Sequence, residues 1–373
     1  MAREPRVNIV RRQVFPEVEV VNCHAVRSDE QLLAICPNTE DILIFQLVGD
    51  EFQRTNVLLK HTQRVTGLAW SCFGRLASCA EDRTAYVWER EADAGDWRSV
   101  LVELRAPRAA LCLAWAPNGM RIAVGLASKD LGICYYEAQA KCWVALKVGK
   151  SKAAVGAVAW HPTSQYIATG STDRRCMVYD VHESLMGQSG FGEMQVNEDA
   201  GSWVNAVAFS PKGQFLAFCG QDATARVKDL TAGPSAPVTT LRWRGLPFLQ
   251  AIFTSERCLI ACGFDCAPVL FRRSDTQWEV YGRLNTGPVV GAPLTERAPT
   301  AFSEARNHFR GSTPGSGGGV ASGTGGTSPQ AGTAASSAWH TNTITACSLL
   351  SSSTGRFSTS ALDGQVLVCE LSM

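Results

Sequence analysis

The chain has 373 residues, of which 45% are hydrophobic and 18% charged, and its formal net charge is +1 at pH 7. This near-neutral balance excludes the broad basic surface that nucleic acids and anionic membranes attract, so we expect no nucleic-acid partner. No run of about 18 apolar residues is present, and the N-terminal stretch with Arg3, Glu4 and Arg6 is not that of a signal peptide, so we expect no membrane insertion.

Aspartate recurs at six positions along the chain. Each aspartate lies six residues before a position that we expect in a β-strand, such as Trp88 or Tyr179. The gaps between successive aspartates are 48, 43, 49, 43 and 98 residues. The first four gaps are close to the roughly 40 to 45 residues of one blade in a WD-type propeller. The sequence therefore predicts an all-β chain, a seven-bladed WD-repeat β-propeller with an insertion in the longest gap. The aspartates are Asp82, Asp130, Asp173, Asp222, Asp265 and Asp363.

The N-terminal part of the chain contains two predicted elements. Residues 17–21 alternate glutamate and valine, and we expect this strand to close the ring by pairing with the last blade. An open propeller would otherwise leave bare sheet edges. The first blade is predicted at residues 23–45, without the recurring aspartate.

The second blade, residues 61–104, carries four polar and aromatic residues at the offsets of a buried hydrogen-bond chain: His61, Ser78, Asp82 and Trp88. In a WD blade such a chain ties the outer connection to the inner turn. A histidine beside an aspartate can also be a catalytic pair, but a satisfied packing network is the commoner role.

The later blades repeat one pattern, in which an apolar run is followed by a turn with proline and glycine and then by a second apolar run ending in small residues. We predict these blades at residues 108–150, 153–181, 202–241, 248–284 and 342–371. Together with the first two blades they make residues 1–373 a single propeller domain.

The fourteen cysteines do not have the spacing of a metal site or a disulfide framework. There is no Cys-x-x-Cys, and most of the cysteines lie in strand runs, where free cysteine packs as a small hydrophobe. Cys258, Cys262 and Cys266 cluster around one turn without a neighbouring histidine, so we expect no metal and place the chain in a reducing compartment. Phosphate-loop, nucleophile-elbow and zinc-protease motifs are also absent, and we expect no enzyme, catalytic residue or cofactor.

Two segments break the rhythm of the blades. The first, residues 182–202, places Phe191 between two glycines, where it is either a hydrophobic plug against the propeller or a contact for a partner. The second is an inserted arm, residues 285–340, whose Gly/Ser-rich tract at 311–338 predicts a flexible tether.

Before that tract, residues 299–310 predict a short helix that Thr300 or Ser303 caps. Phe302, Ala305 and Phe309 fall on one face of this helix. A helix this short needs a docking surface, which is either its own propeller or a groove on a partner.

Several stretches resemble the WD-repeat subunit, subunit 1, of the actin-related protein 2/3 complex, the assembly that nucleates branched actin filaments. The resemblance covers residues 15–370, and two motifs are much more specific than a generic WD repeat: Asp-Arg-x-Ala-Tyr-Val-Trp at 82–88 and Asp-Cys-x-Pro-Val-Leu-Phe at 265–271. The loop at 190–194 resembles a family loop, and residues 302–309 lie where the family carries a protruding helix. The Gly/Ser-rich tract replaces a more charged segment of the family.

This resemblance implies a cytoplasmic, non-catalytic structural subunit of the actin cytoskeleton. Its partners would be the other subunits, including the two actin-related proteins, together with the actin filament and nucleation-promoting factors. Carried over from the family, Phe302, Ala305, Arg306 and Phe309 would form the contact of the helix with actin or an actin-related protein.

A WD-repeat adaptor or substrate receptor of a ubiquitin ligase or signalling pathway, unrelated to actin, is the alternative. Such a receptor would capture a peptide on the rim near Trp203 and Arg226.

Overall fold

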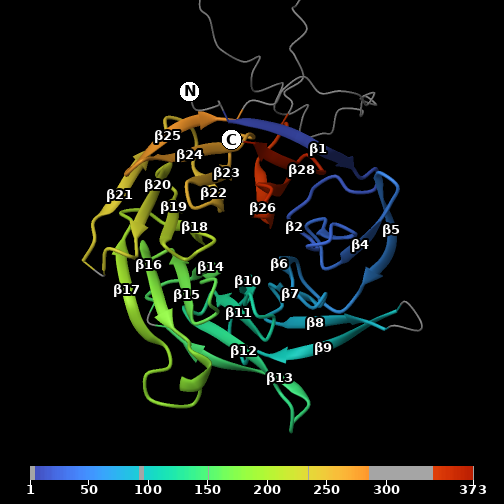
Figure 1. Cartoon of the computed structure of the whole chain (residues 1–373). Coiled ribbons are helices and arrows are strands. Elements are labelled where there is room, and N and C mark those ends of the chain that lie inside the picture. The colour runs from blue at the N-terminus through green and yellow to red at the C-terminus, as the bar shows by residue number, and fades with distance from the viewer. Residues whose placement is uncertain (1–4, 92–95, 150, 234, 285–338, 373) are drawn as a thin grey trace, which may run out of the picture. The chain divides into compact units, whose positions relative to one another are not determined.

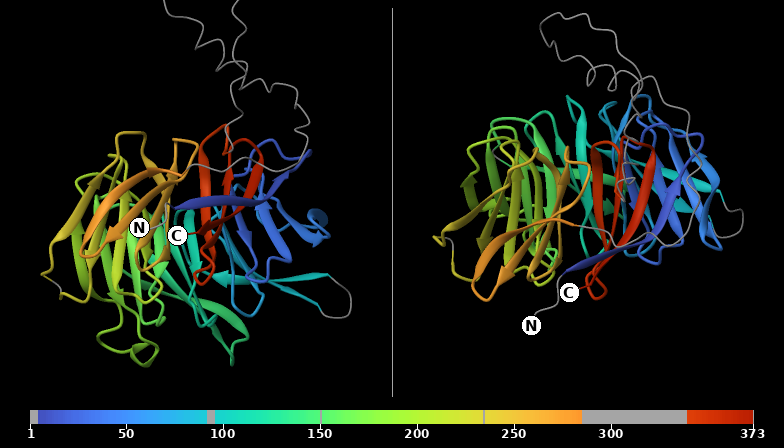
Figure 2. Two further views of the ribbon diagram at one scale, coloured as in Figure 1. Left: turned by 45° about the horizontal axis from the view of Figure 1, so that its top comes forward. Right: turned by 90° about the horizontal axis from the view of Figure 1, so that it is seen from above.

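The computed structural model describes residues 5–91, 96–149, 151–233, 235–284 and 339–372. These residues form seven four-stranded antiparallel blades around a ring (Figure 1). The innermost strands of successive blades are neighbours in chain order, and the innermost strand of the first blade also lies beside that of the seventh. The same ring is seen from two further directions in Figure 2. The all-β, seven-bladed propeller predicted from the aspartate repeat is therefore confirmed.

Each blade is listed from its innermost to its outermost strand. Blade 1 consists of β2 (Cys23–Val26), β3 (Leu32–Cys36), β4 (Ile42–Val48) and β5 (Glu51–Leu58). Blade 2 consists of β6 (Val65–Trp70), β7 (Leu76–Ala80), β8 (Ala85–Arg90) and β9 (Trp97–Glu103). Blade 3 consists of β10 (Ala110–Trp115), β11 (Arg121–Leu126), β12 (Leu131–Glu137) and β13 (Cys142–Val148). Blade 4 consists of β14 (Val155–Trp160), β15 (Tyr166–Ser171), β16 (Arg175–Asp180) and β17 (Glu193–Asp199).

The remaining blades follow the same order. Blade 5 consists of β18 (Val204–Phe209), β19 (Phe215–Gly220), β20 (Thr224–Asp229) and β21 (Val238–Arg242). Blade 6 consists of β22 (Phe248–Ser255), β23 (Cys258–Gly263), β24 (Val269–Ser274) and β25 (Gln277–Arg283). Blade 7 consists of β26 (Ile344–Ser351), β27 (Arg356–Ala361), β28 (Gln365–Ser372) and the N-terminal β1 (Arg6–Val14).

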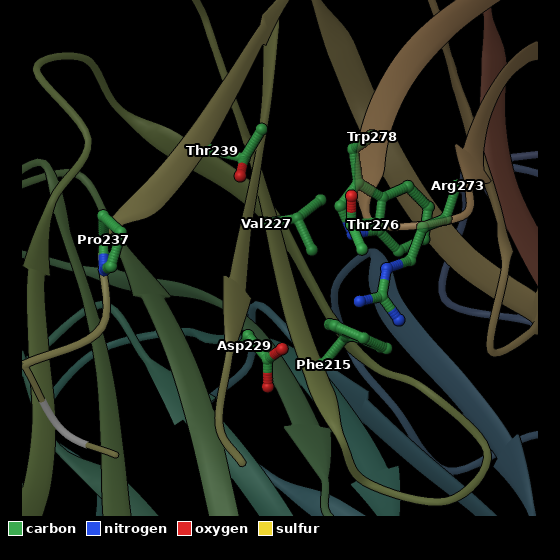
Figure 3. A pocket seen from close by; sticks show the side chains of 8 residues that line it. All are labelled: Phe215, Val227, Asp229, Pro237, Thr239, Arg273, Thr276 and Trp278. Carbon is green, nitrogen blue, oxygen red and sulfur yellow. The ribbon is translucent and has the colours of Figure 1, made fainter. Parts of the chain in front are cut away.

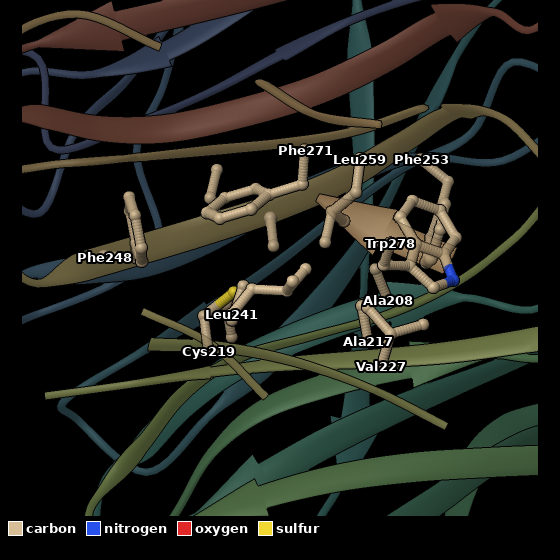
Figure 4. Packing of buried hydrophobic residues seen from close by; sticks show 14 of the residues in the cluster. Ala208, Ala217, Cys219, Val227, Leu241, Phe248, Phe253, Leu259, Phe271 and Trp278 are labelled. Carbon is tan, nitrogen blue, oxygen red and sulfur yellow. The ribbon is translucent and has the colours of Figure 1, made fainter. Parts of the chain in front are cut away.

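Apolar side chains fill the space between neighbouring blades. Between blades 5 and 6, Ala217 and Val227 lie in one buried cluster with Phe248, Phe271 and Trp278 (Figure 4). The second strand of each of these blades is buried along its whole length, because both of its faces are covered by adjacent sheets. Packing between blades thus holds the loops of the ring in fixed positions.

The strand that closes the ring is β1, and the predicted strand at residues 17–21 was wrong. β1 pairs with β28 from Arg6↔Ser372 to Val14↔Gln365, so the two ends of the chain share one blade. Pro16 lies two residues after the end of β1, and a proline restricts the backbone around it and cannot donate to a strand ladder. Residues 17–21 form an irregular segment instead, in which Val18 and Val21 are buried.

Two blades extend further than predicted. Blade 1 does not end at residue 45, because β5 continues the sheet to Leu58. Blade 4 does not end at residue 181, because the outer strand β17 lies inside the segment 182–202 that we predicted as an excursion. Both outer strands are rich in polar residues, so their apolar pattern is weak.

The predicted helix at 299–310 and the tract at 311–338 lie outside the described residues. Trp339 and His340, which we placed at the end of the arm, are buried against the propeller instead. Trp339 donates its indole N–H to the carbonyl of Leu284 at 2.6 Å, which ties the two ends of the insertion together. Among the residues that the structure covers, none belongs to a helix long and apolar enough to cross a membrane.

Candidate protein-interaction face

The six recurring aspartates all lie in turns between the second and third strands of their blades. Because strands alternate in direction, the links from each outer strand to the next inner strand lie on the same side of the ring. We call this side the aspartate face. The aspartates hold the loops of this face in place, and the loop positions determine which side chains the face exposes.

In blade 2 the structure brings His61, Ser78, Asp82 and Trp88 together. The imidazole Nδ1 of His61 lies 3.0 Å from Asp82, and its Nε2 lies 2.8 Å from the hydroxyl of Ser78. Trp88 donates its indole N–H to the same hydroxyl at 2.9 Å. Burial lowers the pKa of His61, against the opposing effect of Asp82, so the ring is neutral near pH 7. A histidine that is buried and bonded at both nitrogens acts as a structural link.

Blade 7 contains a second network that sequence reasoning missed. His340 Nδ1 lies 3.1 Å from Asp363, and its Nε2 lies 3.0 Å from the hydroxyl of Thr359. Burial raises the pKa of Asp363, but hydrogen bonding and charge interaction with His340 outweigh it and lower the pKa overall. The signal was in the spacing, since His340 precedes its aspartate by 23 residues and His61 precedes Asp82 by 21.

The other four aspartates are not bonded to a described histidine. Asp173 accepts from the backbone N–H of Lys152, and Asp130 accepts from Ser128. The remaining two are Asp222, which accepts from Arg226 at 2.7 Å, and Asp265, which accepts from Arg283 at 2.6 Å. Burial raises the pKa of Asp222, but Arg226 and Thr224 outweigh it and bring the pKa down to about 2.

On blades 5 and 6 the aspartate face exposes three large apolar side chains, which we call the blade 5–6 patch. Trp203 is 56% exposed, Leu246 52% and Phe264 38%. Their backbones are held in place: Trp203 accepts from the N–H of Gln221, and Leu246 donates to Asp265. Large exposed apolar side chains on loops that hydrogen bonds hold in place are typical of a surface that binds another protein.

The predicted partner contacts lie in two places. Phe302, Ala305, Arg306 and Phe309 fall outside the described residues. Phe191 is partly buried and packs against the cluster that contains Val148 and Tyr179. The glycines on either side have positive φ, 109° and 81°, which allows the tight turn that presents the ring. This contact favours the plug over the partner contact for Phe191.

The described cysteines do not form a metal site. All fourteen are free thiols, and no group of three or more His, Cys, Asp or Glu side chains able to hold a metal ion occurs in the described ranges. Burial raises the pKa of Cys258 and Cys262, and it raises that of Cys79 in the second blade to about 12. Such thiols stay protonated at neutral pH and are poor metal ligands and nucleophiles.

A small cavity lies between blades 5 and 6 (Figure 3). Its volume is about 60 Å³, and the guanidinium of Arg273 covers the ring of Phe215 at 4.6 Å on one side. This space corresponds to a few water molecules, so the cavity is too small for an organic substrate.

The WD domain, G-beta repeat family matches residues 52–89, 143–180 and 194–229. Each match begins in or at the outer strand of one blade and ends in the third strand of the next. The sequence repeat is thus staggered relative to the blade. Each matched repeat spans parts of two neighbouring blades, so the chain itself links these two blades covalently.

Three curated relatives cover most of the chain. Actin-related protein 2/3 complex subunit 1A of Arabidopsis thaliana is 34% identical over 95% of this chain and 94% of its own length. Subunit 1A-A of Xenopus laevis is 32% identical over 78% of this chain and 80% of its own. Subunit 1 of Schizosaccharomyces pombe is 27% identical over 77% and 82%. The chain therefore belongs to the actin-related protein 2/3 complex subunit 1 family.

Proposed function

We propose that this protein is a non-catalytic scaffold subunit of the actin-related protein 2/3 complex and supports the nucleation of branched actin filaments in the cytoplasm. Family membership carries the proposal, because the similarity to the Arabidopsis subunit spans 95% of this chain and nearly the whole of that relative. Similarity over nearly the whole length of both chains favours the same position in the assembly over a similarity limited to a common repeat.

The scaffold role is supported by how the chain uses its polar groups. Two histidine–aspartate pairs form hydrogen bonds that hold loops in place: His61 with Asp82, and His340 with Asp363. The blade 5–6 patch, by contrast, leaves large apolar side chains in water, and other subunits are the natural cover for them. A propeller of this kind offers rigid rims to several partners at once.

We further propose that the arm contacts actin or an actin-related protein and helps to relay the binding of nucleation-promoting factors. The stripe of Phe302, Ala305 and Phe309, with Arg306 beside it, supports this role, because an amphipathic helix binds through such a face.

The test is to deplete the chain from its own cells, restore it as wild type or variant, and count branches made by the purified complex under the microscope. Wild type should restore branching. Phe302→Asp with Phe309→Asp should leave the complex assembled but weaken branching, while the control Phe302→Leu with Phe309→Leu should keep it. Unchanged branching by the aspartate variant would remove the arm from the mechanism, and full branching without the chain would remove the scaffold role.

A further inference from the structure

The outer strands of blades 2 and 3 meet over only two residue pairs. β9 and β13 run parallel and pair at Trp143↔Val102 and Val144↔Glu103. Before Val102, β9 is paired on one side with β8, and its other edge has no strand partner among the described residues. The two blades therefore separate along this part of β9.

A cavity of about 370 Å³ opens where the blades separate. One wall is blade 2, and the other is blade 3, where Tyr136 is 47% exposed and its ring centre lies 5.9 Å from that of Trp143. We call this space the blade 2–3 crevice. Its lining residues are Arg75, Glu89, Arg98, Val100, Tyr136, Lys141 and Trp143.

The crevice carries an excess of positive charge. Glu89 is the one carboxylate in its lining, and Arg75 pairs with it at 3.0 Å. Arg98 and Lys141 are exposed, and neither forms an ion pair with a described residue. Two cations beside an aromatic wall are complementary to a peptide that has a carboxylate next to an apolar side chain. The carboxylate would contact the cations, and the apolar side chain would pack on the aromatic wall.

The strand edge identifies the chemical nature of the occupant. Arg98 and Val100 are two residues apart on β9, so their side chains point to the same face. A strand added to the free edge of β9 would project alternate side chains over that face, into the crevice, while its backbone bonds to β9. A free phosphate or a lipid headgroup could satisfy the cations but not the backbone edge.

We propose that the blade 2–3 crevice binds an extended, acidic segment of a neighbouring protein subunit, which adds to the edge of β9 and places a carboxylate between Arg98 and Lys141. The identity of the neighbour as a complex subunit rests on the proposed function. An apolar side chain of the same segment packs on Tyr136, Trp143 and Val100.

The test uses the intact complex, purified through a tag on this chain. A carbodiimide couples an ammonium to a carboxylate only when the two are in direct contact, so Lys141 should become linked to an Asp or Glu of another subunit. Amide hydrogens of residues 97–101 should also exchange more slowly in the complex than in the free chain. A link from Lys141 to this same chain, or no link together with unchanged exchange, would overturn the proposal.

Variants give a second, independent measurement. Arg98→Glu with Lys141→Glu should weaken the binding of the linked subunit by about tenfold or more, while Arg98→Lys with Lys141→Arg should retain it. Equal binding by both variants would contradict the charge argument. Membership of the complex is scored separately by the presence of the two actin-related proteins in the same preparation, so its failure is not confused with failure of the crevice.

Discussion

Trp115 at the end of β10 donates its indole N–H to the backbone carbonyl of Ala69 in the preceding blade, over 3.0 Å. Trp70 and Trp160 make the same bond to Ala25 and Ala114, also at 3.0 Å. These three tryptophans occupy equivalent positions at intervals of 45 residues and thus connect four neighbouring inner strands. These bonds are reinforced at the other end of the strands, where Thr66 donates to Ala110 at 2.8 Å.

Replacing Trp115 by phenylalanine should keep an aromatic ring in place but remove the bond between blades. We expect a loss of about 1 kcal/mol in the free energy of unfolding, which is the usual net contribution of one hydrogen bond. Trp203→Phe is the control, because Trp203 is exposed and its indole forms no bond to a described residue. Urea unfolding measures both, and equal midpoints would show that the bond between blades contributes nothing.

Asp82→Ala should destabilise the second blade far more than Asp130→Ala destabilises the third. Asp82 accepts from Thr62, Thr84 and the ring of His61, so its removal strands several donors at a cost of about 1 to 3 kcal/mol. Asp130 occupies the same turn but accepts from Ser128 at the longer distance of 3.1 Å and faces Lys147 at 4.0 Å. Melting temperatures would rank the two variants, and a larger loss for Asp130→Ala would contradict the network.

Val7→Asp should open the ring. Val7 is fully buried on β1 opposite Leu371, and burying an unpaired carboxylate there should cost about 3 kcal/mol or more. Val10→Asp lies on the same strand but is exposed, so its effect should stay within about 0.5 kcal/mol. Limited proteolysis at the N-terminus and urea unfolding check the pair, and similar behaviour of the two variants would mean that β1 does not close the propeller.

Stability should fall in mild acid because of His24. This histidine is buried between Ser358 and Ser360, with 2.8 Å to each hydroxyl, and burial lowers its pKa to about 3. In the unfolded chain a histidine has a pKa of about 6.5, so the unfolded chain binds a proton that the folded chain does not. The stability contributed by neutral His24 is therefore present above about pH 6.5 and is lost as the pH falls toward 3.

The measurement is urea unfolding of wild type and His24→Gln at several pH values. Between about pH 8 and pH 5 the wild type should lose about 2 kcal/mol more than the variant. Parallel curves for the two proteins would show that His24 does not carry the acid sensitivity.

The residues that sequence reasoning found are those whose partners are close along the chain. His61, Ser78, Asp82 and Trp88 fall within one blade, so their spacing alone brings them together. His340 was missed because we placed it at the end of the inserted arm, where the rhythm of the repeat is interrupted. β1 was missed because its partner β28 is more than 350 residues away and its own pattern is largely polar.

The surfaces were harder to predict for a different reason. Trp203 was named as a rim residue, but Leu246 and Phe264 lie on the same face only through the arrangement of two blades. The blade 2–3 crevice depends on how far β9 and β13 separate beyond their two shared pairs. No local sequence pattern indicates how far apart two sheets lie.

The most direct test of the central claim is to tag this protein in its own cells, purify it in moderate salt and identify the co-purifying chains by mass. Membership of the actin-related protein 2/3 complex predicts two actin-related proteins and several small subunits in near-equal amounts with the tagged chain. Their absence, with a ubiquitin-ligase or signalling set in their place, would contradict the proposed function.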